Sequence, residues 1–162
     1  MKSGRVSVSS DEAFILAVLA ACKQVRLEAI VVGSVAGILQ GAPVTTQDLD
    51  LLVRDTPSNR KRIAALGVAL GARPRTITEL SPVLRIDTPA ATVDLLFDRL
   101  PGNLTFRALR ARSVIILLGT ETARVARLED VIASKAAAGR PKDLAQLPVL
   151  RETLSVRKAI KK

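Results

Sequence analysis

Hydrophobic residues recur with two different periods along this chain, which predicts helices and strands in alternation. Apolar side chains between Phe14 and Val25 recur at helical spacing, which predicts a helix through about Arg26. A Ser9-x-x-Glu12 pattern just before it is typical of a capping box. Short apolar runs bounded by glycine, proline or charged residues predict strands instead. They lie at residues 29–32, 49–53, 75–80, 83–87, 92–97, 114–118 and 122–126.

Helical patterns lie between these runs and fill the C-terminal part of the chain. They cover residues 35–40, 57–71, 104–112, 128–138 and 141–154. Pro57 and Pro141 suit the first position of a helix, and Gly71 and Gly139 suit its end. The order of elements predicts an α/β (α+β) fold, a mixed β-sheet flanked by helices with a helical C-terminal part. We expect a single domain over residues 1–162, with an α/β core at 9–126 and C-terminal helices at 127–157.

Two aspartates share one face of the strand predicted near residue 50. Asp48 and Asp50 alternate with leucine, and successive side chains on a strand point to opposite faces, so the two carboxylates lie about 6.5–7 Å apart on the same face. Carboxylates on an otherwise apolar strand repel each other and are costly to bury unpaired. Mg²⁺ resolves both problems, because it prefers one or two carboxylates together with substrate phosphates.

A glycine and a serine follow the apolar run that precedes these aspartates. Gly33 permits a tight turn and a close approach of the backbone to a ligand. Ser34 is placed to cap the next helix, whose N-terminal N–H groups favour an anion such as a phosphate. The segment therefore predicts a phosphate site close to the two aspartates.

A third acid lies in the middle of another apolar run, at residues 92–97. Asp94 needs a partner or a metal ion if that strand is buried. The alternative to a metal is a salt bridge with an arginine at the edge of the core, such as Arg85. Asp87 and Asp98 are rival third carboxylates, but both stand at strand ends, where acids are ordinary.

The segment at residues 128–144 carries the last candidate residues. Lys135 lies in mid-helix among alanine, valine and isoleucine, so its ammonium must reach water or an anion. Arg140 and Asp143 stand at the start of the next helix. The structural alternatives are a lysine that extends to solvent and an aspartate that caps its helix.

At these residues the chain resembles the DNA-polymerase-β-like nucleotidyltransferases. The shared pattern is a Gly-Ser turn, a spacer and Thr-x-Asp-Leu-Asp, carried here by residues 33–34 and 46–50. The resemblance implies that the turn holds the triphosphate of an NTP and that Asp48 and Asp50 bind two Mg²⁺ ions. It makes Asp94 the third carboxylate, which serves as general base or holds the ion that activates the attacking hydroxyl.

Residues 128–144 are similar to the L-x-D-L-x-x-x-K-x-x-A-x-R-x-K-D pattern of the AbiE-type and MenT-like nucleotidyltransferase toxins. The resemblance assigns phosphate contact to Lys135 and places Arg140 and Asp143 along the nucleotide site. It implies transfer of NMP to an RNA 3′ end, tRNA especially, by a toxin with an antitoxin protein as partner. A protein or an aminoglycoside-like small molecule stays open as acceptor. A non-catalytic nucleic-acid-binding protein and a partner-dependent member of the fold stay open as other classes.

Composition narrows this picture further. The net charge of +10 favours an anionic partner, although solubilising surface charge is the alternative. The absence of histidine excludes zinc sites and general-base chemistry that depend on it. The single Cys22 excludes an internal disulfide and is consistent with a reducing compartment. No run of about 18 apolar residues occurs, so we expect a cytoplasmic protein without a membrane span.

Overall fold

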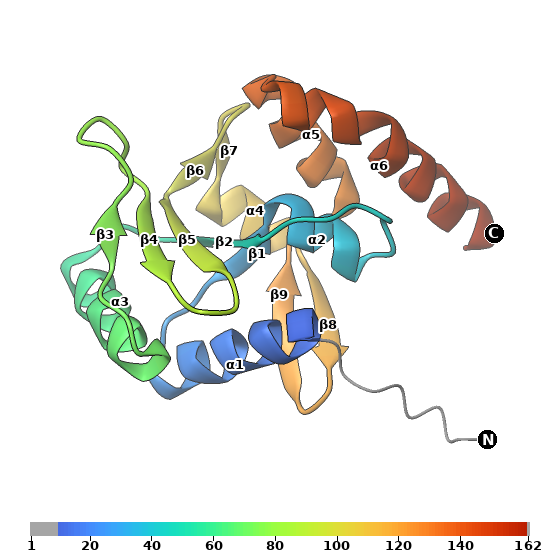
Figure 1. The fold of residues 1–162 in the computed structure, drawn as a ribbon. Helices are drawn as coiled ribbons and strands as arrows, with labels where there is room; N and C mark the ends of the chain where they lie inside the picture. The colour runs from blue at the N-terminus through green and yellow to red at the C-terminus, as the bar shows by residue number, and fades with distance from the viewer. Residues whose placement is uncertain (1–9, 162) are drawn as a thin grey trace.

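A seven-stranded mixed sheet organises the computed structural model, which describes residues 10–161 (Figure 1). The strand order is β3-β4-β5-β2-β1-β9-β8. The strands are β1 (Ile30–Val32), β2 (Asp48–Val53), β3 (Arg75–Thr76), β4 (Leu84–Asp87), β5 (Thr92–Phe97), β8 (Val114–Leu118) and β9 (Glu121–Val125), while β6 (Arg99–Leu100) and β7 (Leu104–Thr105) form a separate pair. The helices are α1 (Ser10–Gln24), α2 (Gly33–Leu39), α3 (Pro57–Leu70), α4 (Phe106–Arg112), α5 (Leu128–Ala138) and α6 (Pro141–Ile160).

The centre of the sheet combines parallel and antiparallel pairs. Strand β2 pairs parallel with β5 and antiparallel with β1, and β1 pairs parallel with β9. Strand β4 pairs antiparallel with both β3 and β5, and β8 pairs antiparallel with β9. This arrangement confirms the mixed sheet flanked by helices that the sequence predicts.

The core consists of aliphatic side chains from every layer. Alternate residues of β2, Leu49 and Leu51, are almost fully buried, whereas Asp48 and Asp50 on the other face are half-buried. Helices α5 and α6 pack on each other, and α5 also packs on α2 (Figure 1). Cys22 is buried, and burial raises the pKa of its thiol to about 12, so it acts as a small core residue. None of the helices within residues 10–161 is long and apolar enough to cross a membrane.

Helix ends that depend on proline and glycine lie where the sequence predicts them. Helix α3 begins at Pro57 and is followed by Gly71 in the left-handed conformation. Helix α5 is followed by Gly139, also left-handed, and α6 begins at Pro141. The capping box expected at Ser9 lies outside the described residues.

Other boundaries differ from the predictions. The run at residues 75–80 keeps only two residues as strand β3, because the segment that follows is an exposed loop. The helix expected at residues 104–112 begins two residues later, since residues 104–105 pair with β6. Helix α6 continues to Ile160 rather than to about residue 154.

Candidate active site

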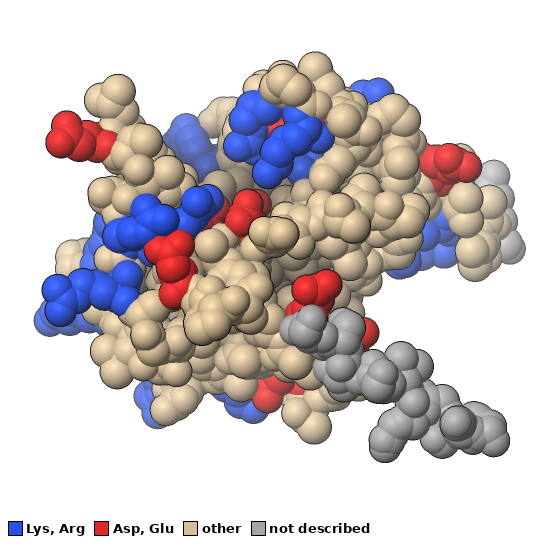
Figure 2. Space-filling view, in the orientation of Figure 1, with Lys and Arg blue, Asp and Glu red and all other residues tan. Residues whose placement is uncertain are grey.

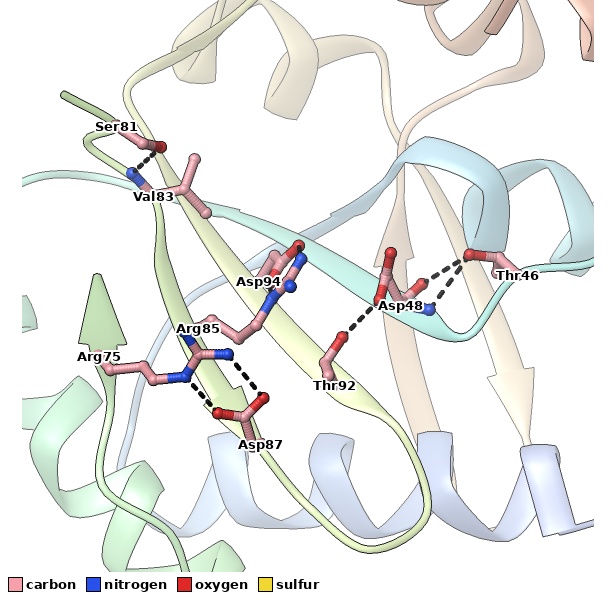
Figure 3. Close-up of polar contacts among 9 residues, drawn as sticks. All are labelled: Thr46, Asp48, Arg75, Ser81, Val83, Arg85, Asp87, Thr92 and Asp94. Carbon is pink, nitrogen blue, oxygen red and sulfur yellow. Dashed lines mark hydrogen bonds and ion pairs between the residues drawn. The ribbon is translucent and has the colours of Figure 1, made fainter. Parts of the chain in front are cut away.

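The parallel strands β2 and β5 bring the predicted carboxylates together. In their register Asp50 lies opposite Asp94, and Asp48 lies opposite Thr92. Thr92 Oγ1 donates a hydrogen bond to Asp48 Oδ1 at 2.5 Å, and Thr46 Oγ1 accepts one from the backbone N–H of Asp48 at 3.2 Å (Figure 3). Directly paired residues point to the same side, so all three aspartates occupy one face of the sheet.

Asp50 occupies the most unfavourable position for a negative charge. Burial, together with the nearby charges of Asp94 and Asp48, raises the pKa of its carboxyl to about 7. Lys135 and Lys142 act in the opposite direction. A cation beside this carboxyl would therefore favour its ionised form.

Asp94 has an ion-pair partner within the sheet. Arg85 on β4 lies directly opposite Asp94 and donates to both of its carboxylate oxygens, at 2.7 and 2.9 Å (Figure 3). The salt bridge that the sequence left as an alternative is thus present, and Asp94 also stands beside Asp50. The rivals lie elsewhere, since Asp87 pairs with exposed Arg75 and Asp98 accepts a backbone hydrogen bond in the turn after β5.

The chemistry of these side chains fits a divalent cation at Asp48 and Asp50. Both are half-buried, they share a face, and their mutual repulsion would be relieved by Mg²⁺. Both oxygens of Asp94 are engaged by Arg85. Within residues 10–161, no group of three acidic or cysteine residues is arranged closely enough to hold a metal ion. A third carboxylate ligand would therefore require a change at the Arg85–Asp94 pair.

The turn between β1 and α2 places Gly33 against the carboxylates. Gly33 has a φ of +67°, and a Cβ atom at this position would lie 3.3 Å from Asp50 Cγ and closer still to Oδ2. Helix α2 already begins at Gly33, with Val32 as its N-cap, so the prediction that Ser34 caps this helix is wrong. Because the helix starts two residues earlier than predicted, Ser34 lies within its first turn, and its hydroxyl makes long-range contacts with Gln146 and Lys135 instead.

Three buried polar residues link α2, α5 and α6 beside this turn. Lys135 Nζ donates to Ser34 Oγ at 3.0 Å and lies 3.5 Å from Asp143 Oδ1. Ser34 Oγ donates to Gln146 Oε1 at 2.9 Å. Burial lowers the pKa of Lys135, although the charges of Asp143 and Asp50 oppose this change. The lysine thus reaches an anionic site within the protein, not solvent.

Arg140 and Asp143 close the outer side of this cluster. Arg140 Nε donates to Asp143 Oδ2 at 2.7 Å, and its backbone N–H bonds the same oxygen at 3.3 Å. Burial would raise the pKa of Asp143, but this hydrogen bond and the charges of Arg140 and Lys135 hold it below its usual value. Asp143 therefore caps α6, as the structural alternative had it, and also anchors Lys135 and Arg140 near the carboxylates.

Two hollows adjoin the carboxylates at successive positions along β2. A small one, about 60 Å³, is lined by Gly33, Asp50, Lys135 and Arg140 among others. A larger, mostly apolar one of about 160 Å³ is lined by Asp48 together with side chains of α1, α2 and the loop before β2. The carboxylate pair thus has a basic hollow on one side and an apolar hollow on the other.

Acidic and basic side chains occupy different parts of the molecular face that carries the carboxylates. Figure 2 shows acidic side chains near the centre of the face, with basic side chains above them and to the left. Lys142 and Lys135 act electrostatically on Asp50, while Arg85 acts on Asp48 and Asp94. An anionic ligand at the carboxylates would therefore meet cations from two directions.

Of the eight residues predicted for the site, Gly33, Asp50, Lys135, Arg140 and Asp143 line one hollow. Hydrogen bonds and strand register connect the other three, Ser34, Asp48 and Asp94, to them. Sequence reasoning assigned no role to Thr92 or Gln146. Thr92 precedes Asp94 by two residues and so shares its face, a signal that strand periodicity offers; Gln146 had no such signal.

Comparison with solved structures identifies the fold. The antibiotic-resistance factor ANT(2″)-Ia in solution is 15% identical, with a TM-score of 0.65 over 96% of this chain and 93% of that one. A crystal structure of ANT(2″)-Ia with adenylyl-2″-tobramycin is 17% identical, with a TM-score of 0.63 over 93% and 92%. A candidate nucleotidyltransferase from Thermotoga maritima is 16% identical, with a TM-score of 0.59 over 98% of both chains. No family model and no curated protein matches the sequence. The chain therefore has the nucleotidyltransferase fold.

Proposed function

We propose that this protein is a Mg²⁺-dependent nucleotidyltransferase that moves NMP from an NTP to an acceptor hydroxyl. The observation that carries the proposal is the side-by-side placement of Asp48, Asp50 and Asp94 next to a basic hollow. Asp50 is costly to ionise unless a cation is present, and the hollow beside it holds the lysine and arginine that an anionic substrate requires. The nucleotidyltransferase fold supports the same assignment.

The residues divide into a phosphate-binding group and a metal-binding group. The turn at Gly33 brings backbone close to the substrate, and Ser34 and Lys135 stand beside it to contact the triphosphate. Arg140, the residue before α6, is exposed and lines the basic hollow, where it would meet the same anion. In this proposal the C-terminal helices complete the nucleotide site, and residues 1–162 work as one domain.

Asp48 and Asp50 would hold two Mg²⁺ ions, and Asp94 would join at the ion next to the acceptor. When bound, the metal neutralises charge on the α-phosphate and lowers the pKa of the attacking hydroxyl. The acceptor oxygen would attack the α-phosphorus in line as the bond to pyrophosphate breaks. Its proton would pass to Asp94 or to water, and Lys135 would neutralise charge on the pyrophosphate that leaves. The protein contributes orientation and fixed positive charge, which account for most of the rate in phosphoryl transfer.

An RNA 3′ end, tRNA especially, is the acceptor we favour. The net charge of +10 and the cations on two sides of the carboxylates suit a polyanion. The resemblance of residues 128–144 to toxin sequences supports the same acceptor and an antitoxin protein as partner. The expected compartment is the cytoplasm.

An aminoglycoside-like acceptor is the second candidate. It is favoured by one observation, the similarity in fold to ANT(2″)-Ia over nearly the whole chain. The basic surroundings of Asp94 count against it, because aminoglycosides are polycations and would be repelled there.

Labelled nucleotide transfer distinguishes these acceptors. The purified protein would be incubated with Mg²⁺ and each α-³²P-labelled NTP, in parallel with total tRNA and with tobramycin. We expect label on tRNA with the wild type and a loss of at least about 10³-fold with Asp48→Ala, since the attacking and leaving oxygens would lose their metal. Full activity in Asp48→Ala would refute the metal assignment. Label on tobramycin but not on tRNA would show that the acceptor is an aminoglycoside and not RNA.

Asp87→Ala provides the matched control. Asp87 lies on β4 near the site, but its carboxylate pairs with exposed Arg75. The substitution removes one negative charge without touching Asp48, Asp50 or Asp94. Transfer should stay within about threefold of the wild type, because an exposed ion pair contributes only about 0–1 kcal/mol.

A further inference from the structure

The Arg85–Asp94 pair has the geometry of a strong and specific interaction. Two nitrogens of the guanidinium donate to the two oxygens of one carboxylate, at 2.7 and 2.9 Å. The exposed fractions of the two side chains are 25% and 11%, so water screens the pair only in part. A bidentate arginine–carboxylate pair of this kind is stronger than a lysine–carboxylate pair or a single hydrogen bond.

Arg85 lies in register with two of the site carboxylates across three neighbouring strands. Arg85 faces Asp94 across the β4–β5 pair, and Asp94 faces Asp50 across the β5–β2 pair, so the three lie in one row. Asp48 and Asp87 also act electrostatically on Arg85. The arginine is therefore the positive charge that the sheet itself supplies to its carboxylates.

The geometry points to Arg85 as a built-in counter-ion that competes with the divalent cation for Asp94. This inference rests on the proposed function, because it takes Asp94 to be a metal ligand. A cation that uses Asp94 would weaken the two guanidinium hydrogen bonds, since two positive charges repel strongly at one carboxylate. Arg85 thereby weakens metal binding by the free protein.

This competition also links the metal to the substrate. An NTP brings phosphate oxygens that serve as further ligands for Mg²⁺. Those ligands offset the cost of separating Arg85 from Asp94, so the metal site would fill together with the nucleotide and not ahead of it. Arg85 is thus a positioning residue, which acts on the reaction through Asp94.

Binding of Mn²⁺ alone tests the inference without measuring catalysis. Free Mn²⁺ would be followed by electron paramagnetic resonance during titration of the full chain without nucleotide. We expect Arg85→Gln to bind Mn²⁺ at least about tenfold more tightly than the wild type, because a hydrogen bond to a charged group is worth about that factor in affinity. Addition of a non-hydrolysable NTP should reduce the difference.

Arg75→Gln is the matched control for a general effect of charge. Arg75 lies opposite Arg85 on β3 and pairs with Asp87 through two hydrogen bonds, but it makes none with Asp94. Its loss removes the same charge from the neighbouring strand, and we expect a change in Mn²⁺ affinity within about twofold at ordinary salt. Equal gains in Arg75→Gln and Arg85→Gln would overturn the inference.

Two further variants keep the result interpretable. Arg85→Lys retains the charge but loses the bidentate geometry, so its Mn²⁺ affinity should fall between those of the wild type and Arg85→Gln, and it carries the test if the glutamine variant fails to fold. Affinity in Arg85→Gln or Arg85→Lys no higher than in the wild type would refute the competition alone. Equal Mn²⁺ binding by the wild type and Asp48→Ala would instead refute the metal site, and the proposed function with it.

Discussion

At the scale of single residues, the negative charge of Asp50 is unfavourable in the folded protein without a bound cation. Burial and the charges of Asp94 and Asp48 raise the pKa of its carboxyl to about 7, so between about pH 4 and pH 7 the folded protein binds a proton that the unfolded chain has released. Stability from this group is therefore lost as pH rises through that window. A carboxyl whose pKa is raised by burial and by neighbouring acids is typical of functional sites.

Asp50→Asn should stabilise the metal-free protein at high pH. The asparagine has no charge to bury, so its advantage should grow from pH 5 to pH 8, by up to a few kcal/mol at about 1.4 kcal/mol for each unit of pKa shift. Thermal unfolding in the presence of a chelator measures the effect. Mg²⁺ should then raise the unfolding temperature of the wild type but not of Asp50→Asn. An unchanged difference between pH 5 and pH 8 would contradict this account.

At the scale of elements, the β1–α2 junction depends on the glycine that opens the helix. Gly33 is left-handed, and its missing side chain leaves room for the Asp50 carboxylate. Gly71, which follows α3, is also left-handed, with a φ of +79°, but a Cβ atom there would meet nothing within 4 Å. A substitution at Gly71 therefore introduces backbone strain alone, whereas the same substitution at Gly33 introduces backbone strain and a clash with Asp50.

Gly33→Ala should be much more damaging than Gly71→Ala. Each substitution carries the strain of a left-handed alanine, about 1–2 kcal/mol. Only Gly33→Ala also forces Asp50 to move, so it should cost additional stability and abolish nucleotide transfer, whereas Gly71→Ala should keep the activity. Thermal unfolding and the labelled-transfer assay measure both effects. Active Gly33→Ala protein would show that the close approach to Asp50 is dispensable.

At the scale of the whole molecule, positive charge gathers around a centre of negative charge. The chain carries 25 lysines and arginines against 15 acids, and basic side chains flank the acidic centre of one face (Figure 2). A field of this kind attracts a polyanion to the site and becomes weaker with salt.

Binding of tRNA should therefore depend strongly on salt. If the protein neutralises two or three phosphates of the tRNA, a rise in salt from 50 to 200 mM should lower its affinity for tRNA about tenfold or more. Filter binding with Asp48→Ala in the absence of nucleotide measures this without turnover. Salt-independent binding, or none, would point away from RNA and toward a small acceptor.

The sequence predicted most elements because their signals are local. Proline and glycine fix the ends of α3, α5 and the start of α6 through their own backbone preferences. The start of α2 was predicted wrongly, since Gly33 is the first residue of the helix in a left-handed conformation that no sequence pattern predicts. Strand β3 was overestimated, because β-type residues form a strand only where a partner strand is present.

By itself, the sequence determined that Asp48 and Asp50 share a face, because alternation along a strand is a local property. Only the tertiary structure decided which groups meet. The β2–β5 register placed Asp94, and not Asp87 or Asp98, opposite Asp50, and the β4–β5 register placed Arg85 opposite Asp94. Helix packing joined Ser34 to Lys135, 101 residues away. Register and packing depend on the whole core, since many distant side chains must be buried at once, and no short segment encodes that balance.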